Sequence, residues 1–235
     1  MEFSAVTKGM RKVLPLKYCG AVIVAAGTAS RMGGIDKVMA ELDGEPMILR
    51  TVRTFQNSDA IKEIVVVTRE DLILPIMRLC AGLDKVKAVV CGGKSRQESV
   101  QLGLNALSSK VKLVAVQDGA RPLITDAVID RTVRAAHSYG AAAPAVPVKD
   151  TIKIAAEQKV ISTPERKRLF AVQTPQVFDA DLLKAALQSA VTVYSSKVKT
   201  LVSQFASKQA RAMRTASSAF RAPEVLGSRV TPLGM

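Results

Sequence analysis

The sequence predicts one α/β domain in which a mostly parallel sheet is covered by helices. Short apolar runs alternate along the chain with segments of helical spacing. Hydrophobic residues make up 48% of the composition, whereas aromatic residues make up 4% and Trp is absent. A core of Val, Ile, Leu and Ala is typical of parallel strands that are buried on both faces. The length of 235 residues suits one domain of ordinary size.

Five apolar runs predict the strands, because they are short, continuous and bounded by Gly or polar residues. They cover residues 21–26, 63–68, 86–91, 112–117 and 141–146. Helical spacing predicts helices over residues 46–56, 71–80, 96–107, 125–139 and 180–188. Asp71 and Thr125 are the expected N-caps of the second and fourth of these helices. The alternation implies right-handed crossovers, so that ligands bind beyond the carboxyl ends of the strands.

Residues 148–172 interrupt this alternation and predict a β-arm. The segment is charged and contains two β-like pieces, at residues 151–155 and 169–172, joined by a polar connection. A hairpin that projects from the domain explains this pattern most simply. We therefore expect a catalytic domain over residues 18–190, preceded by a basic extension (1–17) and followed by an atypical basic tail (191–235). Within that tail, the segment 198–205 fits a strand or a helix.

The net charge of +14 raises the possibility of a nucleic-acid partner. From Leu183 onward, however, eight basic residues accompany the single acid Glu224, which gives +7 and therefore half of the total. The rest of the chain is only moderately basic, as expected for a protein that handles triphosphates. A dedicated nucleic-acid binder is therefore a minor alternative.

Cysteine and histidine usage points to no metal site. The three cysteines lie singly without CxxC spacing, which predicts neither disulfides nor zinc but free, mostly buried thiols. The only histidine, His137, falls inside a predicted helix and is expected to be structural or exposed. No apolar run reaches the roughly 18 residues of a spanning helix, and the run at 19–26 is short for a signal peptide. We expect a cytoplasmic protein without a membrane partner.

The first loop with chemical potential follows the first strand. Ala25, Ala26 and Gly27 open a small-residue stretch in which backbone N–H groups can approach phosphate oxygens. Arg31 and Lys37 add positive charge. The loop has neither the GK[ST] of a Walker loop nor a GxGxxG turn. Alone, it also fits a tight turn with solvated cations.

The second loop follows the third strand. Gly92 and Gly93 permit close approach of a ligand to the backbone, and the Ser99 hydroxyl faces back along the first helical turn. Such a loop can recognise a nucleobase through main-chain contacts. The same residues also fit a helix N-terminus with solvated charges.

The third loop follows the fourth strand and contains Asp118, Gly119 and Arg121. An acid directly after a buried strand can hold Mg²⁺ or orient a substrate hydroxyl, while the neighbouring arginine pairs with phosphate. An Asp–Arg pair that only shapes the turn is the alternative.

These loops, in this order, resemble the 2-C-methyl-D-erythritol 4-phosphate cytidylyltransferases and their ribitol-5-phosphate cytidylyltransferase relatives. The family pattern AAGxGxRMG…K matches residues 25–33 with Lys37, and the GGxxRQ-SVxxGL element matches residues 92–104. The HDAARP element matches residues 117–122. The DT and QTPQxF elements match residues 150–151 and 173–178, so that the resemblance spans roughly residues 20–188.

The resemblance implies a Rossmann-like nucleotidyltransferase fold of the nucleotide-diphospho-sugar transferase type, with a β-arm exchanged across a homodimer. The implied reaction joins CTP to 2-C-methyl-D-erythritol 4-phosphate, with Mg²⁺, and releases pyrophosphate in the non-mevalonate route to isoprenoid precursors. Phosphate oxygen attacks the α-phosphorus in line, so catalysis requires positioning and charge neutralisation rather than a covalent intermediate. Ribitol 5-phosphate is the nearest alternative acceptor.

The same resemblance assigns roles to particular residues. Arg31 and Lys37 would bind the triphosphate as catalytic residues, and Asp118 and Arg121 would contact the sugar phosphate. Asp118 is also a candidate Mg²⁺ ligand. The CTP pocket would be lined by Ala25, Ala26, Gly27, Gly92, Gly93, Ser99, Asp118 and Gly119. From the arm, Thr151 and Arg166 would reach the substrate of the neighbouring subunit, and Thr174 would shape the acceptor site.

The sequence departs from the family pattern in two places. Within the loops, Ala29 replaces Gly, Gln117 replaces His and Gly119 replaces Ala, and we expect these changes to tune binding. After the last predicted helix, the family carries a TDD-type acidic element and an NIKIT-like segment with a second catalytic lysine. Here no Asp follows Asp181 and no such run appears. This predicts a shifted reading frame or a divergent tail, and a chain that binds CTP but turns over weakly or is an inactive relic.

Overall fold

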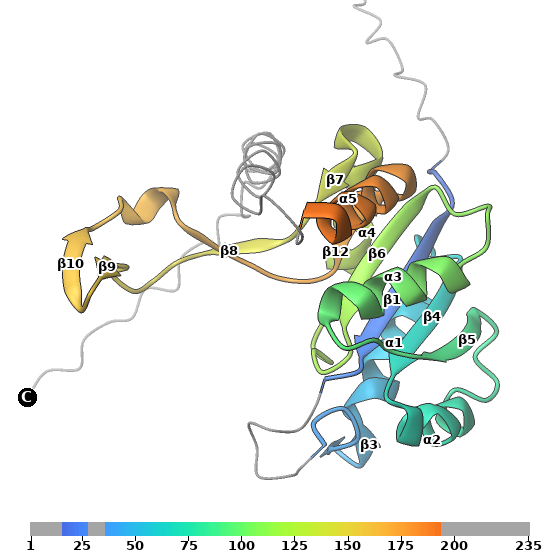
Figure 1. The fold of residues 1–235 in the computed structure, drawn as a ribbon. Helices are drawn as coiled ribbons and strands as arrows, with labels where there is room; N and C mark the ends of the chain where they lie inside the picture. The colour runs from blue at the N-terminus through green and yellow to red at the C-terminus, as the bar shows by residue number, and fades with distance from the viewer. Residues whose placement is uncertain (1–15, 28–35, 194–235) are drawn as a thin grey trace, which may run out of the picture.

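The computed structural model describes residues 16–27 and 36–193. Its centre is a six-stranded sheet with the order β5–β4–β1–β6–β12–β7 (Figure 1). Four neighbouring strands are parallel: β5 (Val86–Cys91), β4 (Glu63–Thr68), β1 (Cys19–Ala25) and β6 (Leu113–Asp118). These are the first four strands predicted from the sequence, displaced by at most two residues. Their carboxyl ends share one edge of the sheet, as the parallel arrangement requires.

The far edge of the sheet differs from the prediction. The expected strand over residues 141–146 is two strands, β7 (Ala141–Ala142) and β8 (Ala145–Pro147), and only β7 belongs to the sheet. The chain leaves the sheet at Pro144, which has no N–H group to donate to a ladder. An unpredicted strand, β12 (Gln176–Asp179), lies antiparallel between β6 and β7. It has four residues, which is too short for its burial pattern to be recognised in the sequence.

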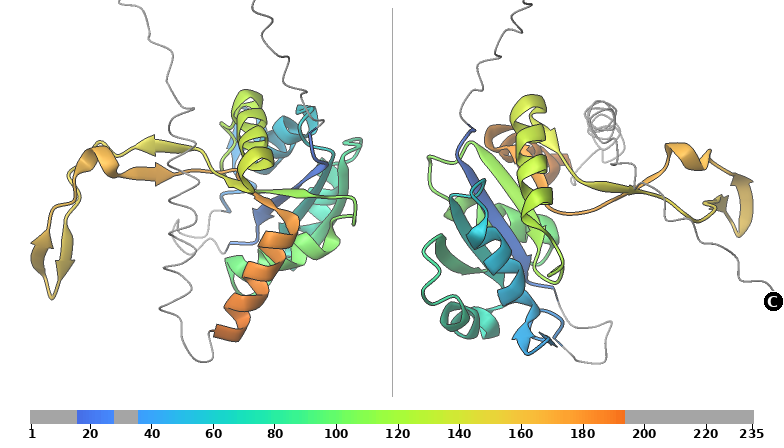
Figure 2. Two further views of the ribbon diagram at one scale, coloured as in Figure 1. Left: turned by 90° about the horizontal axis from the view of Figure 1, so that it is seen from above. Right: turned by 180° about the vertical axis from the view of Figure 1, so that it is seen from behind.

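Helices cover both faces of the sheet (Figure 2). Helices α1 (Met47–Asn57), α2 (Ile73–Leu79) and α4 (Asp126–Tyr139) bury Phe55, Ile76 and Ile129 against one face. Helices α3 (Arg96–Ala106) and α5 (Ala180–Val193) bury Leu104 and Leu183 against the other. Successive residues of the central strands alternate between the two cores, so Val65 faces one and Val66 the other. This explains why the predicted strands are continuously apolar.

Of the two predicted N-caps, Asp71 is wrong and Thr125 is confirmed in position. Asp71 lies in the 3₁₀ turn Glu70–Leu72 that precedes α2, and its carboxylate binds Arg69 instead of capping the helix. Thr125 occupies the N-cap position of α4, but its hydroxyl makes no capping hydrogen bond. Its backbone carbonyl accepts from Val128 and Ile129.

Residues 145–172 form an arm that extends away from the sheet (Figures 1 and 2). At its base, β8 pairs antiparallel with β11 (Phe170–Val172), and at its tip β9 (Ile154–Ala156) pairs with β10 (Lys159–Ser162). The two predicted β-like pieces therefore do not pair with each other. The first pairs with β10, which the sequence did not reveal, and the second pairs with β8, the end of the strand predicted over 141–146. A 3₁₀ turn (Arg166–Arg168) connects the tip to the base, and the short pair β2 (Glu41–Leu42) and β3 (Glu45–Pro46) precedes α1.

The thiols differ in exposure. Cys19 and Cys80 are free and buried, as expected, and burial raises the pKa of Cys19 to about 12 and that of Cys80 to about 11. Cys91 is free but exposed, which corrects the expectation of burial, because it ends β5 on the open side of that edge strand. His137 is half-buried on α4, which agrees with a structural role. Among the described residues, no helix is both long and apolar enough to cross a bilayer.

Candidate active site

The first loop begins where β1 ends, at Ala25. Gly27 is described, whereas Arg31 lies outside the described residues. The chain is described again from Asp36, which organises a turn: its carboxylate Oδ1 accepts from the Val38 amide at 3.2 Å, and its carbonyl accepts from Met39 and Ala40. Lys37 is exposed on this turn. The predicted phosphate-binding lysine is therefore accessible and is carried by a hydrogen-bonded turn.

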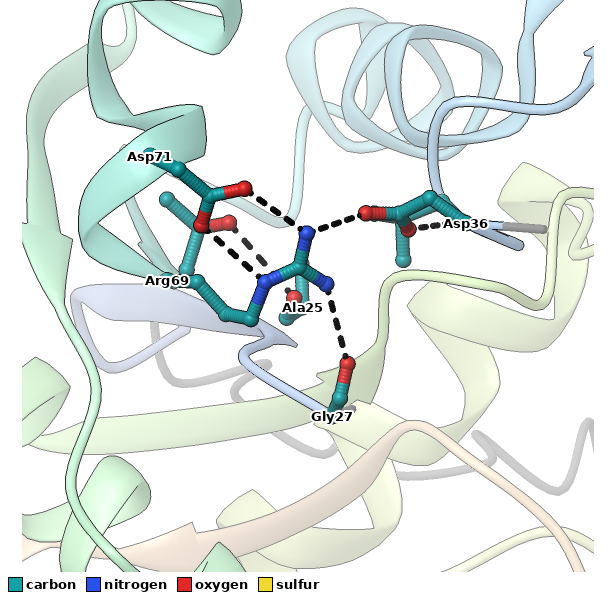
Figure 3. Close-up of polar contacts among 7 residues, drawn as sticks. Ala25, Gly27, Asp36, Arg69 and Asp71 are labelled. Atoms are coloured by element: carbon teal, nitrogen blue, oxygen red, sulfur yellow. Dashed lines mark hydrogen bonds and ion pairs between the residues drawn. The ribbon is translucent and has the colours of Figure 1, made fainter. Parts of the chain in front are cut away.

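An arginine that the sequence analysis did not identify joins the two described ends of this loop. Arg69 follows β4, and Figure 3 shows its guanidinium between Gly27, Asp36 and Asp71. Nη1 donates to the Gly27 carbonyl at 3.4 Å, and Nη2 lies 2.6 Å from Asp36 Oδ2. The preceding residue, Thr68, is buried and places its hydroxyl 3.5 Å from the Ala25 carbonyl. Thr68, which ends β4, and Arg69, which follows it, therefore both support the loop after β1.

The second loop packs closely against the first. A Cβ at Gly92 would lie 2.4 Å from Cβ of Ala26 and 2.9 Å from Oγ of Ser99, so no larger residue fits there. The Gly93 amide donates to Ser99 Oγ at 3.1 Å, and that hydroxyl donates to the Ser95 carbonyl at 2.9 Å. The structure thus brings the predicted residues Ala26, Gly92, Gly93 and Ser99 together.

Helix α3 starts with a capping arrangement that fixes this loop. Ser95 accepts a hydrogen bond from the Glu98 amide at 3.1 Å, and the Glu98 carboxylate accepts from the Lys94 amide at 2.8 Å. The spacing of Ser95 and Glu98 is the sequence signature of this motif. It orders the backbone between β5 and α3, where the sequence predicts recognition of the nucleobase.

In the third loop, Asp118 lies between two arginines. Its Oδ1 is 2.8 Å from Nη2 of Arg96, and its Oδ2 is 3.0 Å from Nε of Arg121. Arg96 belongs to the GGxxRQ element, but the sequence analysis gave it no role. Its partner, Asp118, lies on a different loop, so the sequence alone does not reveal the pair. The pair links the start of α3 to the end of β6.

The backbone after Asp118 is held by hydrogen bonds to β1 and α1. The Gly119 amide donates to the Val24 carbonyl at 2.8 Å, and the Gly119 carbonyl accepts from the Thr51 hydroxyl at 2.8 Å. A Cβ at Gly119 would lie 2.9 Å from Cδ1 of Ile48 and 3.1 Å from Cβ of Ala25. An alanine here, as in the family pattern, needs a small shift of these neighbours.

Gln117 is fully buried where the family pattern has His. Its Nε2 donates to the carbonyls of Asp118 and Arg121, both at 3.3 Å, whereas its Oε1 is buried without a hydrogen-bond partner among the described residues. The side chain therefore ties the turn of the third loop together from inside.

Arg121 is expected to contact the acceptor phosphate. It also donates from Nη1 to Oε1 of Gln173, the first residue of the QTPQ element. Gln173 is fixed in turn by its amide, which donates to the Pro144 carbonyl at 2.8 Å. Thr174 follows and is buried, and its Oγ1 has no hydrogen-bond partner among the described residues. The structure thus brings together the third loop, Gln173 and Thr174, as the roles implied by the family resemblance require.

The arm residues are not brought to this site within one chain. Thr151 is exposed in the segment between β8 and β9. Arg166 donates from Nη1 to the Lys149 carbonyl at 3.0 Å and so braces the two sides of the arm. Both belong to the segment that extends away from the sheet (Figure 1).

The described residues do not form a ready-made metal site. They contain no group of three or more His, Cys, Asp or Glu side chains placed to hold an ion. Both oxygens of Asp118 already face guanidinium groups, whose charge opposes a cation. The role of Asp118 as a metal ligand stays a prediction, and a Mg²⁺ ion held there would need further oxygen ligands, such as those of a triphosphate.

Small residues, glycine backbone and several cations thus meet at the carboxyl edge of a parallel sheet. The small residues admit a flat nucleobase, and the exposed lysine and arginines offer countercharge to a triphosphate. The fold and the site together define a nucleotidyltransferase.

Comparison with known proteins identifies the family. The model of the family described as "IspD: 2-C-methyl-D-erythritol 4-phosphate cytidylyltransferase" matches residues 19–201. The chain is 43% identical over 171 residues to the protein of that name from Alkaliphilus oremlandii, covering 70% of this chain and 72% of the relative. It is 44% identical over 170 residues to the one from Dehalococcoides mccartyi strain 195, covering 71% and 74%. The chain belongs to the 2-C-methyl-D-erythritol 4-phosphate cytidylyltransferase family.

A solved structure agrees in fold. The 4-diphosphocytidyl-2C-methyl-D-erythritol synthase of Anaerococcus prevotii DSM 20548 superposes with a TM-score of 0.69 at 30% identity, covering 78% of each chain. The predicted Rossmann-like nucleotidyltransferase fold is confirmed. So is the predicted class of enzyme, a cytidylyltransferase.

Proposed function

We propose that this chain transfers the cytidylyl group of CTP to 2-C-methyl-D-erythritol 4-phosphate and releases pyrophosphate. The observation that carries the proposal is Asp118, held between Arg96 and Arg121 beside the glycine loop of Gly92 and Gly93. This arrangement places the expected nucleotide pocket next to arginines that can bind the phosphate of the acceptor substrate. The relatives reported above are named for the same acceptor.

The transfer forms one bond and breaks one. An acceptor phosphate oxygen attacks the α-phosphorus of CTP, and the bond from that phosphorus to the oxygen bridging to the β-phosphate breaks. Pyrophosphate leaves with the electron pair. Arg31 and Lys37 neutralise charge at the triphosphate, and Arg121 holds the acceptor phosphate. Ala26, Gly93 and Ser99 hold the cytosine and ribose in place, so that attack is in line.

Mg²⁺ accompanies the nucleotide in this proposal. When bound, it supplies charge neutralisation to the phosphate oxygens and to the leaving pyrophosphate. Asp118 would contribute at most part of the ligand set, because both of its carboxylate oxygens contact arginines, and triphosphate oxygens would supply the rest. A requirement for Mg²⁺ is tested by adding EDTA to the assay and restoring the ion in excess.

The arm supports a homodimer. Among the described residues, seven of the thirteen most exposed large hydrophobic side chains lie on it: Val146, Ile152, Ile154, Val160, Ile161, Phe170 and Val172. Isolated two-stranded ribbons bury little surface of their own, so these side chains favour a partner. A second copy also brings Thr151 and Arg166 to a neighbouring site, which they do not reach in their own chain.

The first experiment measures pyrophosphate release from CTP and Mg²⁺, with methylerythritol phosphate and ribitol 5-phosphate offered in parallel. Turnover with the former alone is expected. Turnover only with ribitol phosphate would reassign the acceptor. CTP binding without turnover would support the prediction that the tail (191–235), of which residues 194–235 lie outside the described part, impairs catalysis.

The dimer is tested by sedimentation and by subunit mixing. We expect Ile161→Lys to shift the protein to monomer, whereas Leu74→Lys, an exposed apolar position on α2, leaves the dimer intact. Mixing the impaired Asp118→Asn and Arg166→Ala chains raises activity if each site uses an arm from its partner, because one site per mixed dimer is then native. No recovery in an exchanging mixture contradicts the shared site. A cytoplasmic location is also proposed, and fractionation of expressing cells tests it.

A further inference from the structure

Arg69 makes four hydrogen bonds to three different segments, yet the roles assigned above leave it out. Its Nη1 donates to the Gly27 carbonyl, which lies at the end of the described part of the first loop. Its Nη2 contacts Asp36 at 2.6 Å, where the chain is described again. Nε and Nη2 also bind the two carboxylate oxygens of Asp71, at 3.1 and 3.0 Å. Figure 3 shows the guanidinium central to these groups.

Each partner has a distinct position relative to the nucleotide loop. Asp71 lies two residues from Arg69 in the chain, so this bidentate pair sets the direction of the guanidinium. Gly27 and Asp36 flank the segment that carries Arg31, and Asp36 immediately precedes Lys37. The guanidinium therefore connects the point where the loop leaves the sheet with the point that carries the lysine.

The charge state of this cluster is stable. The hydrogen bonds that Arg69 donates to Asp71 and Asp36 raise the pKa of Arg69, and the bond from Arg69 lowers the pKa of Asp71. Both shifts favour the charged forms of Arg69 and Asp71, so this pair stays ionised near neutral pH.

We propose that Arg69 is a positioning residue that fixes the separation of Gly27 and Asp36 and thereby places Lys37 against the triphosphate. The inference rests on the function proposed above. Arg69 acts through Asp36 rather than on the nucleotide, because Nε and both N–H groups of Nη2 are already used by carboxylates and one N–H group of Nη1 by Gly27. Only the second N–H group of Nη1 is left, so a bidentate contact with phosphate would require one of these bonds to break.

The Asp36 turn gives the proposal a readout that is independent of turnover. Asp36 Oδ2 faces Arg69, while its Oδ1 accepts from the Val38 amide and its carbonyl accepts from Met39 and Ala40. Loss of the guanidinium frees the carboxylate and loosens this turn. The amides of Val38, Met39 and Ala40 are then expected to exchange with deuterium faster in Arg69→Met than in wild type.

The kinetic test compares Arg69→Met with a matched control, Arg134→Met, which removes the same group from an ion pair with Asp130 on α4. For Arg69→Met we expect kcat/KM for CTP to fall by about 10- to 100-fold, because a misplacement of about 1 Å has effects of that size. KM for the acceptor should stay within about twofold, and Arg134→Met should match wild type. Arg69→Lys should not restore activity, because a point charge cannot bridge three partners.

A double variant separates positioning from direct binding. If Arg69 acts through Asp36, the double variant Asp36→Asn/Arg69→Met should lose no more activity than the less active of the two single variants. Fully additive losses would instead indicate that Arg69 contacts the nucleotide, and would overturn the proposal. Unchanged amide exchange in Arg69→Met would overturn it as well, whatever the kinetics. If wild type does not turn over, the proposed function fails, and the exchange measurement together with CTP affinity still decides the role of Arg69.

Discussion

The hydroxyl of Thr51 lies 2.8 Å from the carbonyl oxygen of Gly119, and this contact joins helix α1 to the loop that carries Asp118. Thr51 is fully buried, and its hydroxyl also lies 3.0 Å from the Met47 carbonyl of its own helix. One proton serves two acceptors, so the long-range bond competes with a local one. The position of the third loop thus depends on a side chain that touches no substrate.

We therefore expect Thr51→Val to lower both stability and activity. The buried Gly119 carbonyl loses its side-chain partner at a cost of about 1–3 kcal/mol in the free energy of unfolding. The same change should reduce kcat/KM several-fold by loosening the loop. Urea denaturation and steady-state kinetics measure the two effects. Thr51→Ser keeps the hydroxyl and should retain most of the activity, and equal losses in both variants would assign the effect to packing.

Asp118→Asn should impair catalysis without unfolding the protein. The neutral amide weakens the ion pairs with Arg96 and Arg121, so the second and third loops lose their shared anchor. We expect kcat/KM to fall by about 10²-fold, in line with the effect of a small misplacement of reacting groups. Stability should change by less than about 1 kcal/mol, because both pairs are partly exposed. Asp130→Asn, which weakens the pair with Arg134 on α4, is the control and should leave kinetics unchanged.

Gly103→Ala tests the contact between α3 and the sheet. A Cβ at Gly103 would lie 2.4 Å from Cγ1 of Val22 and 2.7 Å from Cγ2 of Val67. Overpacking of this kind costs about 1–3 kcal/mol, and the higher helix propensity of alanine offsets about 1 kcal/mol of it. A lower denaturation midpoint is expected. Adding Val22→Ala should recover part of the loss, whereas a further decrease equal to that of Val22→Ala alone would exclude the steric explanation.

Thiol labelling should distinguish Cys91 from the other two cysteines. Because burial raises the pKa of Cys80 to about 11, only roughly one part in a thousand of it is thiolate at pH 8, and the fraction is smaller for Cys19, whose pKa is about 12. Raising the pH increases these fractions, but burial still blocks access. Maleimide should therefore modify exposed Cys91 first, and Cys91→Ser should remove the fast phase. Bound CTP should slow the reaction because Gly92 and Gly93 follow directly; equal rates with and without CTP would place the nucleotide elsewhere.

The parallel half of the fold was predictable because long apolar strands and helical spacing are local signals. The strands at residues 63–68 and 86–91 appear at the predicted positions. In the antiparallel half, β7 falls inside the strand predicted over 141–146, but β12 was not predictable, because its four residues are defined by pairing with β6 and β7. Their hydrogen bonds join residues that are far apart in the chain, which no local pattern reports.

The site shows the same division. Gly92, Gly93 and Ser99 were predictable, because a glycine pair before a helix is a visible motif and the structure brings it against Ala26. The roles of Arg69 and Arg96 were not, since an arginine in a sequence does not reveal its partner. Asp36 and Asp118, their respective partners, come from other loops. The catalytic roles assigned to Arg31 and Lys37 stay predictions.

The point of insertion of the arm makes it a replaceable module. Its two ends leave the sheet from neighbouring strands, because Ala142 pairs with Val177 and the Gln173 amide donates to the Pro144 carbonyl. A short turn from Pro144 to Gln173 would therefore close the chain and leave all six strands paired. Natural or designed variation in the length and sequence of this arm can therefore change the surface that it presents, while the loops at the carboxyl ends of the parallel strands keep their support.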